Sequence, residues 1–250
     1  MSPICIIPAR LKSSRFPRKI LAPFGSSSLL HYVWKAAKET ALFSAIYIAL
    51  DAEETATHVQ NFGASFVFTS PDCPSGSMRI AEAAEKLGIE NQVVVGWQAD
   101  EPFITPSTMH TLLHTIKSCP AADVWSLKKK IREKEEMLSP HVVKVVCNHA
   151  EYALYFSRSL IPHYRDKDAL EGTYYKHIGL YAYAPHILPK LSSLPSSPLE
   201  EAEKLEQLSF LQAGWKIKMA NTEEEIKGID TPSQMELARL HLEKLTQRLT

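Results

Sequence analysis

The sequence lacks several features that mark common protein classes. It has only 9 glycines in 250 residues, and neither G-x-G-x-x-G nor G-x-x-x-x-G-K-[ST] occurs. This argues against a Rossmann dehydrogenase and a P-loop nucleotidase. No apolar run approaches the ~18 residues of a membrane-spanning helix, so we expect no membrane insertion. The start has no basic stretch before its short apolar run, which does not fit a signal peptide.

The sequence also lacks closely spaced cysteines, and it has no formal net charge. The four cysteines are far apart and show no CxxC spacing, so we expect no disulfide framework or structural zinc site. Reduced cysteines in a cytoplasmic protein are the default interpretation. Lys+Arg and Asp+Glu both number 28, which gives a formal net charge of zero. Nucleic-acid and membrane-surface binders usually carry net positive charge, so we expect neither as a partner.

The zero net charge hides an uneven distribution. No acidic residue precedes Glu39, whereas seven basic residues do, and five of them lie between residues 10 and 19. Cations on one short loop repel each other unless an anion neutralises them. Arginine matches the geometry of phosphate, and lysine adds a compact charge. The loop therefore predicts an anion site, with a solvated basic surface loop as the alternative.

Apolar runs alternate with helical patterns in the first 100 residues. We expect strands at 3–9, 45–50, 64–68 and 92–98, with helices at 28–38, up to about 61 and at 77–87. This order is typical of an α/β protein with a parallel sheet. Strands at 123–129, 141–147, 152–157 and 177–183 then follow with little helix between them, which predicts a more antiparallel section. Ser197 and Thr231 are predicted to cap two further helices, the first with an apolar stripe that reaches Leu211.

Two carboxylates follow this pattern at positions suited to a metal. Asp100 comes directly after the fourth strand, and Asp230 lies just before the capping Thr231. In open α/β sheets, ligands bind at the carboxyl ends of the strands, where the basic loop also begins. A hydrated Mg²⁺ that binds substrate phosphates needs only one or two protein carboxylates. A turn or a helix dipole explains each aspartate alone, but together with the basic loop they predict a metal–phosphate site.

Three further groups of residues are less specific. They are His177 with Tyr181 on one face of a strand, Glu206 with Gln207 on a helix, and Ser75, Gly76 and Arg79 in a small-residue loop that opens a helix. The first group has a hydrogen-bonded core histidine as its alternative. The second has a solvated helix face, and the third an ordinary helix N-cap. These groups become informative only in combination.

The motifs and their order resemble those of the 3-deoxy-manno-octulosonate cytidylyltransferases. PAR…SSRFPRK, SGSMR, QADEP, YALYFSR, HIGLYAY, LEQL and GIDTP follow one another from residue 3 to about 240. The resemblance implies an α/β nucleotide-diphospho-sugar transferase fold with three layers and a mostly parallel central sheet. It implies one domain over residues 1–250, in which a strand-rich section at roughly 120–180 forms a homodimer. It also implies a cytoplasmic, Mg²⁺-dependent nucleotidyltransferase of lipopolysaccharide biosynthesis. The reaction would convert CTP and 3-deoxy-manno-octulosonate to the CMP-sugar and pyrophosphate.

The resemblance also implies roles for single residues. Catalytic roles fall to Arg10, Arg15, Lys19 and Asp100, of which the three cations hold the triphosphate, and the metal ligands are Asp100 and Asp230. Substrate binding falls to Ser75, Gly76, Arg79, Gln98, Arg158, His177, Tyr181, Glu206 and Gln207. Ala99 and Arg18 stand where the family usually has Gly, and Met78 where it usually has Glu. Ala99 would be strained if its position required a positive φ, and Arg18 would add charge beside the triphosphate.

Two other functions remain open at this point. A cytidylyltransferase acting on a nine-carbon sugar acid, such as a CMP-sialate synthetase, shares the basic loop, although HIGLYAY and LEQL weigh against it. A non-catalytic CTP-binding module would bind the nucleotide without releasing pyrophosphate. A purely structural protein would leave the basic loop and the two aspartates unexplained.

Overall fold

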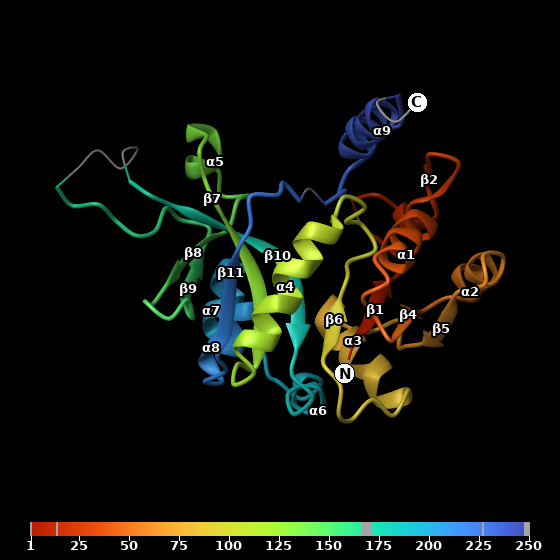
Figure 1. The fold of residues 1–250 in the computed structure, drawn as a ribbon, viewed down its shortest axis with the longest axis horizontal. Coiled ribbons are helices and arrows are strands. Elements are labelled where there is room, and N and C mark those ends of the chain that lie inside the picture. The colour runs from red at the N-terminus through yellow and green to blue at the C-terminus, as the bar shows by residue number, and fades with distance from the viewer. Residues whose placement is uncertain (1, 14, 167–171, 227, 248–250) are drawn as a thin grey trace. The chain divides into compact units, whose positions relative to one another are not determined.

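The fold is described from a computed structural model of the chain, which covers residues 2–13, 15–166, 172–226 and 228–247. Ser14 of the basic loop lies outside these residues. The chain divides into two compact units, Met1–Ile104 with Ile226–Thr250 and Thr105–Glu225, called here the first and second unit (Figure 1). In the described residues, none of the helices combines the length and the apolar character needed to cross a membrane.

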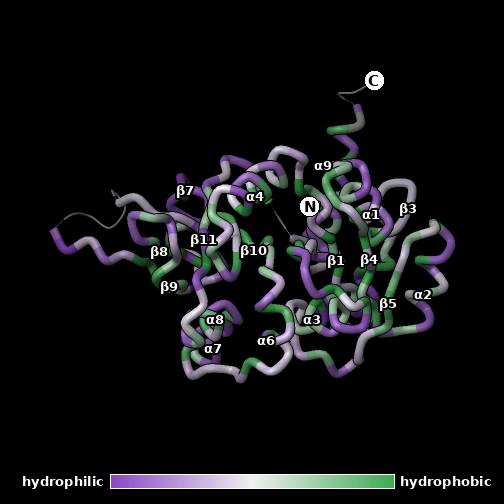
Figure 2. The backbone as a smooth tube through the Cα atoms, turned by 60° about the horizontal axis from the view of Figure 1, so that its bottom comes forward, coloured by the Kyte–Doolittle hydropathy of each residue, from purple (hydrophilic) through white to green (hydrophobic). Residues whose placement is uncertain are grey.

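The first unit contains a parallel sheet. Its strands are ordered β5 (Ser65–Phe68), β4 (Ala45–Leu50), β1 (Ile4–Ala9) and β6 (Val94–Gly96), and all neighbours run parallel. Every residue of β1 is buried, because a central parallel strand is covered on both faces. Figure 2 shows the matching pattern, with β4 green and the surface loops mostly purple or white. The expected parallel sheet is confirmed.

Helices of the first unit begin where the sequence places capping residues. The Oγ of Ser28 accepts the His31 N–H at 3.1 Å and starts α1 (Leu29–Glu39). Ser75 caps α3 (Gly76–Lys86) in the same way. Thr231 and Gln234 form the expected capping box of α9 (Pro232–Gln247). The remaining elements are α2 (Glu53–Gln60), a 3₁₀ turn η1 (Lys19–Leu21) and a small hairpin of β2 (Pro23–Phe24) and β3 (Ser27–Ser28).

Antiparallel pairs dominate the second unit. Strand β7 (Val124–Lys130) pairs antiparallel with β10 (Tyr175–Tyr183), and β8 (Lys144–Cys147) pairs antiparallel with β10 and with β9 (Ala153–Ser157). The expected antiparallel section is therefore confirmed. The sequence prediction missed α4 (Pro106–Ser118) and β11 (Ile217–Asn221), which is parallel to β7. Thr105 as N-cap and Pro106 at the first helical position were the available signals for α4.

The helix predicted to start at Ser197 is two helices, so that prediction was wrong. Ser197 does cap α7 (Pro198–Glu203), but Lys204 adopts a left-handed conformation with φ 54° and ends it. A second helix, α8 (Gln207–Gln212), follows. The apolar spacing of Leu205, Leu208 and Leu211 carries no sign of this break, because it is compatible with one continuous helix. Two short helices, α5 (Lys134–Leu138) and α6 (Leu188–Leu191), complete the unit.

Candidate active site

A cavity of about 310 Å³ opens at the carboxyl ends of β1 and β6 in the first unit. It contains every site residue that the sequence predicts for this unit: Arg10, Arg15, Lys19, Ser75, Gly76, Arg79, Gln98, Asp100 and Asp230. They come from four separate stretches of sequence, and the parallel sheet brings them together because its strands end at one edge. No described residue forms an ion pair with Arg10, so its guanidinium is available to an anion.

Lys19 joins the two predicted metal ligands. Its Nζ lies 2.6 Å from Asp100 Oδ2 and 3.3 Å from Asp230 Oδ1, and Arg15 reaches the same Asp230 oxygen at 3.0 Å. The Lys19 side chain is only 9% exposed, whereas those of Asp100 and Asp230 are 30% and 44% exposed. The two carboxylates therefore converge on one cation while keeping their outer sides open to the cavity.

The donor set of this arrangement fits a magnesium ion. Oxygen donors from Asp100 and Asp230 already share one positive charge, and both line the cavity. The described residues contain no cluster of three or more His, Cys, Asp or Glu suited to a metal. Mg²⁺ does not require one, because substrate phosphates and water complete its shell.

Glu101 is an acid beside this site whose Oε2 is buried and to which the sequence assigned no role. Its Oε2 has no hydrogen-bond partner among the described residues. Burial, reinforced by the negative charges of Asp100 and Asp230, raises the pKa of Glu101 to about 8. The carboxyl group is therefore protonated at neutral pH. Its place directly after Asp100, ahead of a proline, was the only sequence signal.

The departures from the family pattern have different structural consequences. Ala99 does not have a positive φ, so the strain considered for it does not arise. Arg18 does have one, with φ 58°, and its guanidinium pairs with Glu54 at the start of α2. The added charge of Arg18 is thus shared with a carboxylate. Met78 lies in the first turn of α3, where its N–H binds the capping Ser75.

In the second unit, His177 and Tyr181 lie together on β10, with ring centroids 5.3 Å apart. Ser126 donates its hydroxyl hydrogen to the Ile178 carbonyl, so its oxygen accepts from His177 Nε2 at 3.0 Å. This hydrogen bond places a proton on Nε2. Desolvation among Phe156 and Tyr181 lowers its pKa to about 3. This histidine is a hydrogen-bonding group and not a cation.

Other predicted residues of this unit lie near the break between α7 and α8. Glu206 directly precedes α8, and Gln207 is its buried first residue. The Arg158 guanidinium donates to the carbonyls of Pro140 and Glu203, and the Glu203 carboxylate accepts from the Arg158 N–H. Arg158 therefore connects the end of β9 to the end of α7, and much of its hydrogen-bonding capacity is already used.

Comparison with known proteins gives a consistent result. The cytidylyltransferase family model matches residues 4–220. A 3-deoxy-manno-octulosonate cytidylyltransferase of Porphyromonas gingivalis is 40% identical over 246 residues, covering 96% of each chain. One from Geobacter sulfurreducens is 39% identical and covers 98% of this chain and all of its own. The chain belongs to the 3-deoxy-manno-octulosonate cytidylyltransferases. The expected family and its nucleotidyltransferase activity are thereby confirmed.

Solved structures agree with membership of the cytidylyltransferases. A structure of CMP:2-keto-3-deoxy-manno-octonic acid synthetase complexed with CTP has a TM-score of 0.90 at 36% identity, covering 96% of this chain and 98% of that one. HddC from Yersinia pseudotuberculosis has a TM-score of 0.68 at 13% identity and covers 96% and 99%. The second comparison shows the fold alone. The expected fold class is confirmed.

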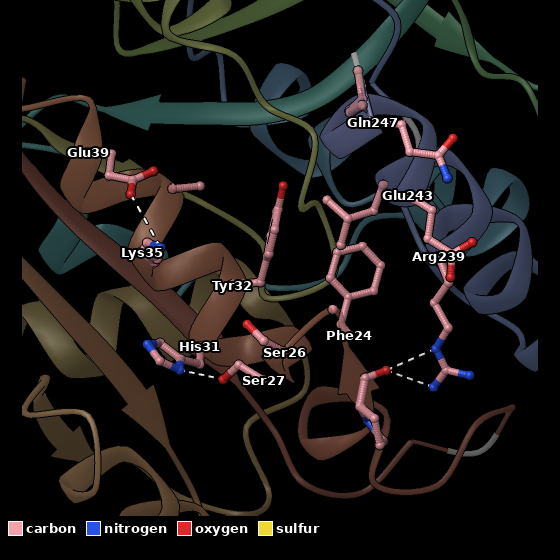
Figure 3. Close-up of a pocket in the computed structure, with 15 residues that line it drawn as sticks. Phe24, Ser26, Ser27, His31, Tyr32, Lys35, Glu39, Arg239, Glu243 and Gln247 are labelled. Carbon is pink, nitrogen blue, oxygen red and sulfur yellow. Dashed lines mark hydrogen bonds and ion pairs between the residues drawn. The ribbon is translucent and has the colours of Figure 1, made fainter. Parts of the chain in front are cut away.

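This member of the cytidylyltransferases has a second, larger cavity of about 960 Å³ among α1, the β2–β3 hairpin and α9 (Figure 3). None of the predicted site residues lines it. Its cationic groups are already paired, since Arg239 donates to the Pro23 carbonyl and Lys35 pairs with Glu39. The smaller cavity is therefore the candidate active site, because it combines two accessible carboxylates with Arg10, which has no ion-pair partner among the described residues.

Proposed function

We propose that this protein transfers the cytidylyl group of CTP to 3-deoxy-manno-octulosonate, releasing pyrophosphate and supplying an activated sugar for lipopolysaccharide biosynthesis. The observation that carries the proposal is the single cavity in which a basic loop meets Asp100 and Asp230. Relatives of this name, about 40% identical over almost the whole chain, support the choice of substrates.

Arg10, Arg15 and Lys19 bind the triphosphate in this proposal. The anomeric hydroxyl oxygen of the sugar loses its proton to water and bonds to the α-phosphorus as the bond from that phosphorus to the bridging oxygen breaks. Charge then accumulates on the departing pyrophosphate, and fixed cations stabilise it at that stage. Arg10 is available for this directly, whereas Arg15 and Lys19 must share their charges between carboxylates and phosphates.

Asp100 and Asp230 are proposed to hold Mg²⁺. The bound ion would neutralise phosphate charge and make the attacking hydroxyl more acidic. Before the ion binds, the charge of Lys19 keeps the two carboxylates close together, because they would otherwise repel each other. Ser75, Gly76, Arg79 and Gln98 are proposed to contact the nucleotide from the α3 side of the cavity. A side chain at Gly76 would crowd Gln98, because an added Cβ would lie 3.2 Å from its Oε1.

The sugar acid is proposed to bind residues of the second unit. Those residues are Arg158, His177, Tyr181, Glu206 and Gln207. A neutral His177 donates or accepts hydrogen bonds with sugar hydroxyls at no cost in charge burial. We further propose a single functional domain and a homodimer that uses residues 120–180. We also propose a cytoplasmic location, as the family resemblance implies.

A coupled pyrophosphate assay tests the proposed reaction. The protein is incubated with CTP, Mg²⁺ and 3-deoxy-manno-octulosonate, and pyrophosphate release is followed. We expect release that depends on all three components. Binding of CTP without release would favour the non-catalytic module, and faster transfer to a nine-carbon sugar acid would favour a CMP-sialate synthetase.

An Asp100→Asn variant tests the proposed metal ligand. We expect turnover to fall by about 10²–10⁴ with an unchanged circular dichroism spectrum, because one ligand oxygen loses its charge. The measurement is the same assay at limiting Mg²⁺. Near-normal turnover under those conditions would remove Asp100 from the mechanism.

A further inference from the structure

The corner between β4 and α2 holds a buried carboxylate that no proposed substrate contact uses. Asp51 directly follows β4, and its side chain is 7% exposed. Its Oδ1 accepts the backbone N–H of Leu11 at 2.9 Å, and its Oδ2 pairs with Arg79 NH2 at 3.2 Å. Leu11 immediately follows Arg10, so one side chain contacts the start of the basic loop and the first turn of α3.

Arg79 is fixed as firmly as Asp51. Its side chain is 2% exposed, and its NH1 donates to Thr69 Oγ1 at 2.5 Å. The Thr69 hydroxyl in turn donates to the Leu50 carbonyl at the end of β4. The guanidinium is therefore held in the cavity wall between two polar groups. A buried cation of this kind needs its counter-ion, because water does not replace it.

We propose that Asp51 is a positioning residue of the nucleotide site. It holds the basic loop against α3, so that Arg10 faces the same cavity as Ser75 and Gly76. The inference rests on the proposed function, since it concerns CTP binding at that cavity. The proposal also gives Arg79 two roles. Its charge is balanced by Asp51, and only the outer edge of its side chain lines the cavity.

The neighbouring ion pair provides a natural comparison. Glu54 lies in the first turn of α2 and pairs with Arg18 near the other end of the same loop. The Glu54 side chain is 43% exposed, and exposed pairs contribute little because water and salt compete with them. The loop is therefore attached to this corner at two points, and the buried attachment at Asp51 is the one that fixes its position.

The test uses an Asp51→Asn variant of the full chain, with Glu54→Gln as the matched control. The asparagine retains an acceptor for Leu11 but presents no charge to Arg79. We expect KM for CTP to rise about tenfold or more, since small displacements of binding groups have large effects. In Asp51→Asn, KM for the sugar acid should stay within about threefold of wild type. In Glu54→Gln, KM for both substrates should stay within about threefold of wild type.

A purely structural role would lower the active fraction and leave KM for CTP unchanged in the remaining enzyme. That result with Asp51→Asn would overturn the proposal. If Asp51→Asn does not fold, Thr69→Val replaces it, because this substitution removes the second Arg79 partner without removing a charge. A wild-type KM for CTP in Thr69→Val would then overturn the proposal, and a rise of about threefold would support it.

The proposed function fails separately. If wild-type protein binds CTP but releases no pyrophosphate, the reaction is wrong while the positioning role is still measurable as a dissociation constant. Asp51→Asn should then weaken CTP binding relative to Glu54→Gln. An equal affinity in the two variants would count against the positioning role.

Discussion

Two buried lysines, one in each unit, show how the same side chain serves different purposes. Lys19 faces the two carboxylates of Asp100 and Asp230 in the cavity. Lys144 is fully buried in β8, and its Nζ donates to three backbone carbonyls, those of Ser139, Val142 and Arg158. Charged, partly exposed partners can exchange one cation for another, whereas carbonyl groups of the chain cannot. The first lysine is suited to binding, and the second fixes a loop.

Burial shifts the pKa of a lysine in the second unit and of an acid in the first. Burial lowers the pKa of Lys144, with the Arg158 charge acting in the same direction and Glu203 opposing it. The ammonium is kept because three acceptors converge on it. In the first unit the buried acid Glu101 has the raised pKa instead. Neighbouring carboxylates thus reinforce the raised pKa of Glu101, whereas burial is the main cause of the lowered pKa of Lys144.

A Lys19→Met variant should have the largest effect. We expect turnover in the pyrophosphate assay to fall by about 10²–10³, because a charge that stabilises the leaving group is lost. The free energy of unfolding should change by no more than about 1 kcal/mol, since Asp100 and Asp230 keep contact with water. A large loss of stability with retained turnover would reverse the roles assigned to the two lysines.

Lys144→Met should show the opposite pattern. We expect a loss of about 2–4 kcal/mol in the free energy of unfolding, because three buried carbonyls lose their donor. Urea denaturation measures this, and Lys130→Met at the exposed end of β7 is the control, with an expected change within ~0.5 kcal/mol. Equal stability of the two variants would show that the carbonyls find other donors.

Much of the first unit could be predicted from the sequence, and less of the second. Arg10, Arg15 and Lys19 are visible because no acidic residue interrupts their segment, and strand ends locate Asp100. The burial of Lys144 is not visible, because a lysine among valines fits a solvated strand edge equally well. The break at Lys204 is also hidden, since the left-handed residue that ends α7 is a lysine and not the glycine that usually marks such an end. Asp51 was missed as well, because its buried pairing with Arg79 depends on contacts 28 residues apart.

His177 should make the stability of the protein depend on pH, with a smaller effect than those expected for Lys19→Met and Lys144→Met. Its pKa of about 3 in the folded chain lies below the unfolded value of about 6.5, so unfolding takes up a proton as the pH falls between these values. Stability is therefore intact above pH 6.5 and decreases below it. At pH 5.5 the loss should be at most about 1.4 kcal/mol. Between pH 7.5 and 5.5, the free energy of unfolding of His177→Gln, measured by urea denaturation, should fall by correspondingly less than that of wild type. An identical fall in the two proteins would exclude this residue as the cause.

Arg18→Gly should have the smallest effect and sharpens the comparison within the basic loop. Glycine removes the cost of a left-handed Arg18 but also removes its exposed pair with Glu54. We expect a net change within about 1 kcal/mol, as the two contributions offset each other. KM for CTP should stay within about threefold of wild type. A larger rise would mean that the Arg18 charge itself contacts the triphosphate.

Glu101 also alters the electrical balance of the whole chain. The formal count of zero assumes that every carboxyl group is ionised. A buried acid with a pKa of about 8 keeps its proton at pH 7, so this group adds about one positive charge to that count in the folded molecule. On unfolding, the acid returns to an ordinary carboxylate and releases that proton. Taken alone, this proton moves the isoelectric point of the folded protein to the basic side of its composition-based value of 7.2.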